Sequence, residues 1–374
     1  MDTYVKLFIG GEWRDGAEGE RIAVEDPATR EIFAEVAGGT PADAIAAVHA
    51  ADHAQKAWAK TAPRTRAEIL RACWQILVDH TDELAELIVR EHGKPLADAK
   101  GEVAYAAEFF RWNAEETVRI RGEIGVAPSG ANRMIVHHPP VGVVVMITPW
   151  NFPAAMITRK LAPALGAGNG VVIKPPVQTP LTALRVAELL TEAGVPEGLV
   201  NVVPTTQAGA WFDAAIAEQP VRMVSFTGST EVGRKLLEKS ANRVLKTVME
   251  LGGNAPFIVF ADADLDAAVE GAMVAKMRHS AETCTAANRF LVEAPVAAEF
   301  TDRLAAAMAA VKVGRGFDEG VTCGPLIDQP SLDKVGSLVS AAVESGATVA
   351  TGGGPLDSPG FFYAPTVLGG VQPG

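Results

Sequence analysis

From Val141 onward, short apolar runs alternate with helix-like segments, and this alternation restricts the possible folds more than any other feature. Apolar runs of about four to eight residues are typical of strands buried on both faces of a parallel sheet. Right-handed crossovers through the intervening helices then predict an α/β fold with a doubly wound, Rossmann-type parallel sheet. The runs are VGVVVMI at 141–147, GVVIK at 170–174, LVNVV at 199–203, VRMVSF at 221–226, VLKTVMEL at 244–251 and APFIVF at 255–260.

The flanking regions have different textures. The N-terminal third is expected to be mostly helical, and Thr40 and Pro41 mark one helix start as N-cap and first helical residue. Two further helical stretches are expected near 64–92 and 95–120. Segment 122–138 mixes Gly, Pro and Ser with a short alternating run, which suggests an extended excursion or hairpin. Strands and helices after about residue 252 suggest a second α/β lobe.

Composition excludes several classes of protein. The net charge of −12 and the lack of a Lys/Arg run argue against a nucleic-acid partner or an anionic membrane surface. No apolar run reaches the ~18 residues that span a bilayer, and the first residues do not resemble a signal peptide. Three cysteines in 374 residues do not make a disulfide framework, so we expect a cytoplasmic protein.

Two strand ends carry groups suited to a nucleotide. In FTGSTEVG at 226–233, Gly228 would allow a close backbone approach, and the following helix N-terminus would favour a pyrophosphate. The fingerprint G-x-G-x-x-G is absent, so an ordinary βα turn remains the alternative. Lys174 ends another strand, where it could bond a ribose or a phosphate. Its alternative is a solvated lysine.

Two further strand ends could carry chemistry. Asn151 lies in PWNFP, where two prolines would stiffen the loop around an uncharged hydrogen-bond donor suited to an oxyanion. The alternative is a structural loop closed by a buried Trp. Glu250, on an apolar strand before two glycines, could be a general base whose pKa is raised by burial. The alternative is an acid that merely ends a strand.

The three cysteines differ in their surroundings. Cys73 lies in an amphipathic helix and is expected in the core, whereas Cys323 lies in a Gly/Pro loop without a nearby base. Cys284 lies in a polar loop just after Arg278 and His279, and nearby positive charge would favour its thiolate. Cys284 is therefore the best candidate nucleophile, with an inert thiol as the alternative. No set of residues has the spacing of a metal site, and none is expected.

Together and in this order, PWNFP, VVIKP, FTGSTEVG, ELGGNAP and TCTAANR resemble the aldehyde dehydrogenase superfamily over essentially the whole chain. The stretch ITPWNFPAAMITRKLAPAL at 147–165, and the spacing from the FTGST motif at 226 through ELGGNAPFIVFADADLD, which ends at Asp266, look most like succinate-semialdehyde dehydrogenases. The resemblance implies that Cys284 attacks the aldehyde carbon, that Asn151 holds the oxyanion and that Glu250 activates the hydrolytic water.

The resemblance also implies a cofactor site and a substrate site. NAD or NADP is the implied cofactor, with NADP mildly favoured because Val177 replaces an acid found in NAD-preferring relatives. Arg159 and Arg278 match positions that hold the substrate carboxylate, a task suited to Arg. A structural pairing with Asp or Glu is the alternative for both. The implied cofactor-binding residues are Trp150, Lys174, Val177, Thr227, Gly228, Ser229 and Leu251.

The implied domain organisation has three parts. Residues 1–121 and 139–251 would form the dinucleotide-binding domain, 122–138 an oligomerisation arm, and 252–374 an incomplete catalytic domain. Family members continue beyond the position of Gly374, so we expect poor activity and aggregation of the isolated chain. Other departures are Ala281-Glu282 before the nucleophile, and Ala286 where some relatives have a second cysteine. A homo-oligomer is expected. A general aldehyde dehydrogenase and an inactive nucleotide-binding relative remain the alternatives.

Overall fold

The computed structural model describes residues 5–372, which form two compact units. The first unit contains the chain up to Val24 together with Ala34–Leu84 and Lys100–Glu250, and the second contains Glu25–Phe33, Ala85–Ala99 and the chain from Leu251. The expected domains differ from these units because 25–33 and 85–99 pack with the second unit. The outermost residues of the expected domains, 1–4 and 373–374, lie outside the described residues.

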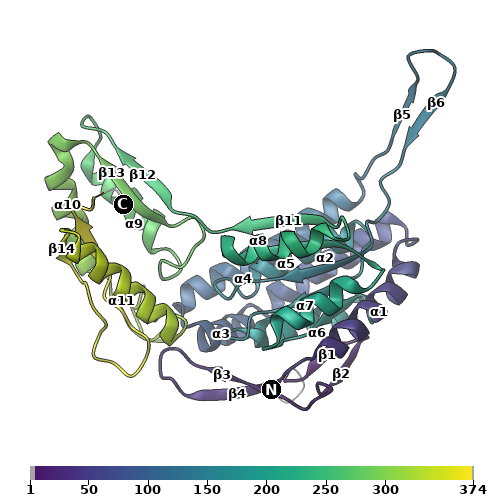
Figure 1. Ribbon diagram of the computed structural model, residues 1–374, viewed down its shortest axis with the longest axis horizontal. Helices are drawn as coiled ribbons and strands as arrows, with labels where there is room; N and C mark the ends of the chain where they lie inside the picture. The colour runs from purple at the N-terminus through teal and green to yellow at the C-terminus, as the bar shows by residue number, and fades with distance from the viewer. Residues whose placement is uncertain (1–4, 373–374) are drawn as a thin grey trace. The chain divides into compact units, whose positions relative to one another are not determined.

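A seven-stranded sheet forms the centre of the first unit, in the order β11-β10-β7-β8-β9-β1-β2 (Figure 1). The strands β7, β8, β9 and β10 are parallel, as the alternating pattern predicted. In β7, Val145 pairs with Val172 on one side and with Val224 on the other, and all three are buried. The strands are β1 Leu7–Ile9, β2 Glu12–Arg14, β7 Val143–Ile147, β8 Val171–Lys174, β9 Val200–Val202, β10 Val221–Gly228 and β11 Lys246–Leu251.

Helices cover both faces of this sheet. Helix α1 contacts β7, β8 and β9 and packs on α7, whereas α5 and α6 contact the sheet and pack on α2. Side chains from α1, α7 and the sheet share one buried apolar cluster around Trp211 and Phe212. The helices are α1 Pro41–Trp58, α2 Pro63–Asp79, α3 Thr81–His92, α4 Leu96–Thr117, α5 Ala155–Gly166, α6 Pro180–Glu192, α7 Ala208–Ala217 and α8 Thr230–Ala241.

Several local predictions for the first unit are confirmed. Thr40 is the N-cap of α1 and directly precedes Pro41. The Thr40 side chain forms a capping box with Asp43. Segment 122–138 forms an antiparallel hairpin, β5 Glu123–Val126 with β6 Arg133–Val136, which extends away from the sheet of this unit (Figure 1). The antiparallel edge strands β1 and β2 were not expected, and neither was the two-stranded sheet β3 Arg21–Glu25 with β4 Ile32–Ala37.

The second unit has its own small sheets. Run 255–260 is the strand β12 Ala255–Val259, which pairs in parallel with β13 Ala287–Val292 rather than continuing the large sheet as expected. Helices α9 Leu265–Met277 and α10 Ala294–Ala309 pack together around Phe300. The remaining elements are α11 Gln329–Glu344, β14 Thr348–Thr351 and β15 Val367–Gly369. Within residues 5–372, no helix is long and apolar enough to cross a membrane.

Candidate active site

A pocket of about 450 Å³ lies at the carboxyl ends of β7, β8, β9 and β10 in the first unit. The chain moves from β7 to β8 and β9 on one side and then returns to place β10 on the other side of β7. Ligands of open α/β sheets bind at such a reversal of strand order. The lining residues are Ile147, Thr148, Pro149, Trp150, Lys174, Pro176, Val177, Gln178, Thr205, Thr206, Ala208, Phe226, Thr227, Gly228, Ser229 and Val232.

Lys174 is buried at the end of β8, which contradicts the alternative of a solvated lysine. Its residue is 8% exposed, and its Nζ donates a hydrogen bond to the carbonyl oxygen of Pro175 at 3.1 Å. Burial lowers the pKa of this amine to about 8, because the charged form loses its hydration. The pocket therefore contains an amine that would gain from an anionic or hydrogen-bonding partner.

The N-terminus of α8 forms another wall of the pocket. Ser229 is the N-cap, and its Oγ accepts a hydrogen bond from Val232 N at 3.3 Å. A side chain on Gly228 would meet the ring of Phe226, since an ideal Cβ would lie 2.5 Å from its Cζ. Because Gly228 has no side chain, the Phe226 ring and the first residues of α8 can both line this side of the pocket. The exposed N–H groups of a helix start favour an anion such as a pyrophosphate.

These features fit a dinucleotide. The pocket combines apolar walls, a buried amine and a helix N-terminus, and it brings together six of the seven residues implied for cofactor binding. Leu251 ends β11 and is not among the lining residues. Thr205 and Thr206 also line the pocket, and sequence reasoning missed them. The sequence could have identified them as pocket residues, because they closely follow the apolar run at 199–203 and so lie near the carboxyl end of a strand.

Asn151 lies in the loop between β7 and α5, also in the first unit. Phe152 of this loop is buried. The buried carboxylate of Glu102 accepts hydrogen bonds from Ala154 N at 2.9 Å and Ala155 N at 3.2 Å. It therefore compensates the free N–H groups where α5 starts, directly after the Asn151 loop. Sequence reasoning did not identify Glu102, which lies in α4, far away along the chain.

Helix α5 also carries two cations. Lys160 is buried and its Nζ donates a hydrogen bond to Ser225 Oγ at 2.9 Å. Burial and Arg159 lower the pKa of Lys160 to about 8, while Glu250 acts in the opposite direction. Arg159 lies with its guanidinium over the ring of Phe109, 5.8 Å from the centroid. Sequence reasoning missed Lys160, although it stands next to Arg159.

Glu250 is exposed near the end of β11, which corrects one expectation. The apolar run around Glu250 in the sequence suggested a buried carboxylate, with an acid that merely ends a strand as the alternative. That run instead forms an outer strand of the sheet, with exposed and half-buried side chains in alternation. Water therefore has free access to the Glu250 carboxylate.

Cys284 is exposed in the second unit, whereas Cys73 and Cys323 are buried. Burial raises the pKa of Cys73 and raises that of Cys323 to about 12, which keeps both thiols protonated. Cys323 lies in the expected Gly/Pro loop, but the expectation that no base lies nearby is wrong. It forms a β-bridge with Val313 and lies near the carboxylates of Glu282 and Asp98.

His279 does not supply the positive charge that was expected beside Cys284. Burial, Lys94 and Arg278 lower its pKa to about 3, so the ring is neutral at physiological pH. Arg278, the C-cap of α9, is exposed and remains a source of positive charge upstream of the thiol. Among residues 5–372, no carboxylate forms an ion pair with Arg159 or Arg278. The pairing expected under the structural alternative is thus not seen.

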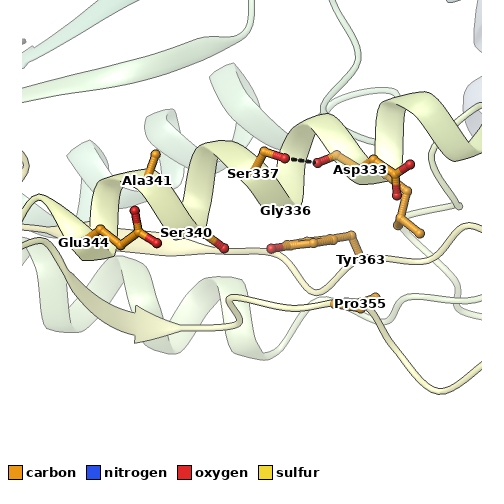
Figure 2. Close-up of a pocket in the computed structure, with 9 residues that line it drawn as sticks. Asp333, Gly336, Ser337, Ser340, Ala341, Glu344, Pro355 and Tyr363 are labelled. Carbon is orange, nitrogen blue, oxygen red and sulfur yellow. Dashed lines mark hydrogen bonds between the residues drawn. The ribbon is translucent and has the colours of Figure 1, made fainter.

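A second groove lies along α11 in the second unit (Figure 2). Figure 2 shows the Tyr363 ring beneath the small residues of the helix. Ser337 Oγ donates a hydrogen bond to the carbonyl oxygen of Asp333 at 2.8 Å, so this hydroxyl is already used. We assign this groove no role in the chemistry.

A family model described as the aldehyde dehydrogenase family matches residues 13–374. The chain belongs to the aldehyde dehydrogenase family. It is 53% identical to a succinate-semialdehyde dehydrogenase of Paenarthrobacter nicotinovorans, over 91% of this chain and 76% of the relative. It is 48% identical to an NADP(+) succinate-semialdehyde dehydrogenase of Escherichia coli K12, over 97% and 75% of the two chains.

A solved structure shows the same fold. The succinate-semialdehyde dehydrogenase of Burkholderia pseudomallei has a TM-score of 0.97 and 45% identity, over all of this chain and 78% of the other. These comparisons confirm the family, the fold class and the enzyme class that the sequence implied. Expected roles of individual residues remain predictions.

Proposed function

We propose that this aldehyde dehydrogenase uses NAD or NADP to oxidise an aldehyde that carries a carboxylate, such as succinate semialdehyde, to the carboxylic acid. The observation that carries the proposal is the pocket at the carboxyl ends of the parallel strands. Its walls combine Lys174 with the α8 N-terminus, and the residues implied by the family motifs meet there. An exposed Cys284 supplies a nucleophile of the kind that this chemistry needs.

In the proposed reaction, the Cys284 thiolate attacks the aldehyde carbon and forms a thiohemiacetal. The Asn151 amide and the Cys284 backbone N–H donate hydrogen bonds to the oxyanion. A bound NAD or NADP would supply the acceptor for the hydride that leaves this carbon, so that a thioester remains on Cys284. Glu250 takes a proton from a water molecule, which attacks the thioester, releases the acid and restores the thiolate. The exposure of Glu250 suits contact with water.

The cofactor would be held by residues that line the pocket. Lys174 would bond the adenosine ribose or its 2′-phosphate, and Gly228 and Ser229 would face the pyrophosphate. Val177 offers neither a hydrogen bond nor a repelling charge, so it permits both cofactors and mildly favours NADP. Trp150, Thr227 and Leu251 complete the proposed cofactor-binding set.

Arg159 and Arg278 would bind the substrate carboxylate. Neither forms an ion pair with a carboxylate among the residues that the structure describes, although burial raises the pKa of the Asp98 carboxyl and the charge of Arg278 opposes that rise. Arg binds carboxylates through paired N–H donors, which would favour a semialdehyde over an uncharged aldehyde.

Steady-state rates test these roles. We expect NAD(P) reduction with succinate semialdehyde to exceed that with hexanal, and the Cys284→Ser variant to have no turnover. Arg278→Ala and Arg159→Ala should raise KM for the semialdehyde by roughly ten-fold or more, while hexanal rates hold. Arg303→Ala is the matched control, since Arg303 pairs with Glu299 on an exposed helix face. Equal rates on both aldehydes in the wild type would exclude the carboxylate site.

The β5–β6 hairpin would act as an oligomerisation arm between copies of the chain. Apolar side chains cover it, with Ile124 72% and Ile135 62% exposed. Exposed apolar surface of this kind favours association. Sedimentation of Ile124→Glu should give a smaller species than the wild type, and an unchanged mass would exclude the arm. We place the enzyme in the cytoplasm, with neither nucleic acid nor membrane as a partner.

A further inference from the structure

The turn that precedes Cys284 has an unusual backbone. His279, Ser280 and Ala281 have φ values of 52°, 56° and 65°, so three consecutive residues with side chains are left-handed. Each such residue costs about 1 kcal/mol or more relative to ordinary conformations. A turn of this kind persists only where its surroundings fix it, so the contacts that fix it also place Cys284.

Two of these contacts involve the first residues of the turn. His279 N donates a hydrogen bond to Asp98 Oδ2, in the first turn of α4, at 3.1 Å. Ser280 Oγ accepts a hydrogen bond from Gly324 N at 2.8 Å, and Ser280 is buried. Both partners come from segments distant in sequence.

The third contact involves Glu282, two residues before the nucleophile. Its Oε2 lies 3.3 Å from Nε2 of His92, at the end of α3, and the two side chains are 7% and 0% exposed. The carboxyl group therefore packs into the second unit against a buried ring. An ionised carboxylate in such a place loses several kcal/mol of hydration, and a neutral acid loses far less.

We propose that Glu282 is a positioning residue for Cys284, an uncharged carboxylic acid that holds the turn before the nucleophile through its contact with His92. The proposal rests on the assignment of Cys284 as the nucleophile. An uncharged Glu282 also resolves a difficulty of the sequence, because an ionised carboxylate near Cys284 would oppose thiolate formation.

The charges around this pair are consistent with two neutral partners. Burial raises the pKa of Glu282 well above its ordinary value of 4.5. The charges of Lys94 and Lys276 oppose this shift, and that of Asp328 adds to it. Burial lowers the pKa of His92 well below 6.5, and Lys94 and His279 act in the same direction. Charged or titratable groups that act on the pair are Lys94, Lys276, His279, Cys323 and Asp328, and Asp98 and Arg278 act on Lys94 or His279 beside it.

Alkylation of Cys284 by iodoacetamide tests the proposal without requiring turnover. The other two cysteines are buried with raised pKa values, so the rate as a function of pH reports on Cys284. We expect Glu282→Gln to match the wild type within about two-fold at pH 7, because the amide is uncharged and similar in shape. At alkaline pH, where Glu282 ionises, the wild-type rate should fall roughly ten-fold below that of Glu282→Gln.

Other variants separate positioning from a general loss of charge. Glu282→Ala should slow alkylation at pH 7, and Gln should restore it. The matched control is Glu270→Gln, which removes an exposed carboxylate from α9 and should follow the wild type at every pH. Two results would overturn the proposal: identical wild-type and Glu282→Gln profiles at all pH values, or faster alkylation of Glu282→Gln already at pH 7.

Infrared spectroscopy gives a readout on the unmodified chain. At pH 7 the wild type should show the C=O stretch of a protonated carboxyl group, and His92→Gln should shift it. A wild-type spectrum without that band would refute the proposal even if the variants did not fold. If instead Cys284→Ser kept turnover, the proposed function would fail, while the alkylation profile would still decide the state of Glu282.

Discussion

Raising the pH should weaken NADP binding much more than NAD binding, because Lys174 is buried where the cofactor would lie. The pKa of this amine is lowered to about 8 by burial. About nine-tenths of the amines are charged at pH 7 and about one-tenth at pH 9. A bound 2′-phosphate favours the charged amine and so raises its pKa in the complex. Above pH 8, NADP binding must therefore take up a proton.

The size of the effect follows from this linkage. The apparent Kd for NADP should rise about ten-fold per pH unit above 8, until the pH reaches the raised pKa of the complex. A ribose hydroxyl gains much less from the charge on Lys174, so the Kd for NAD should change by no more than about three-fold over the same range. Below pH 7 the amine is already charged in the free enzyme, and Lys174 should contribute no pH dependence.

Calorimetric titration in two buffers of different ionisation enthalpy measures both quantities. We expect almost no proton uptake with NADP at pH 7 and uptake approaching one proton at pH 9. Lys174→Met, which keeps the apolar stem, should abolish the uptake and the slope. Parallel pH profiles for NADP and NAD, or NADP binding at pH 9 without proton uptake, would refute the contact between Lys174 and the phosphate.

Three further predictions concern single residues. Gly228→Ala should displace the Phe226 ring and raise the cofactor Kd by roughly ten-fold, because the new Cβ would lie 2.5 Å from that ring; Gly209→Ala, with no atom within 4 Å, is the control, and an unchanged Kd would contradict the packing. Ala281→Gly should stabilise the protein by about 1 kcal/mol in thermal denaturation, because glycine removes the left-handed penalty at φ 65°; Ala305→Gly inside α10 should destabilise it, and two equal losses would argue against strain in the turn. The pKa of His279 is lowered to about 3, so the stabilising contribution of the neutral ring is complete above pH 6.5 and is lost as the pH falls toward 3. His279→Asn should therefore lose less stability than the wild type between pH 6.5 and 4. Matching stability curves would show that the ring is not held neutral.

The parts of the fold that were predictable are encoded locally. The capping box at Thr40 depends on residues within one turn of helix, and the strands from 143 to 228 follow from apolar runs followed by amphipathic helices. The place of the pocket that we propose for the cofactor was predictable for the same reason, because carboxyl ends of parallel strands converge at one edge of a sheet. Thr205 and Thr206 could have been found by applying that rule to β9 as well.

What could not be predicted depends on partners distant in the chain. The apolar run at 255–260 has the same texture as the strands of the large sheet, yet it pairs with β13. Glu102 caps α5 from a different helix. His279 is neutral because it is buried, whereas Glu250 is exposed. A single sequence does not reveal how deeply a titratable residue is buried.

On the proposed role of Cys284, the geometry of its turn controls the nucleophile more than local positive charge does. With His279 neutral, the charge expected beside the thiol is reduced to that of Arg278. Three left-handed residues cost about 3 kcal/mol in total, and the hydrogen bonds to Asp98 and Gly324 return about 1 kcal/mol each. These two hydrogen bonds do not offset the whole cost, so the turn also depends on its other contacts, among them that of Glu282 with His92. An acid at position 282 therefore aids catalysis only while it remains uncharged and bound to His92, since its ionisation would both weaken that contact and oppose the thiolate.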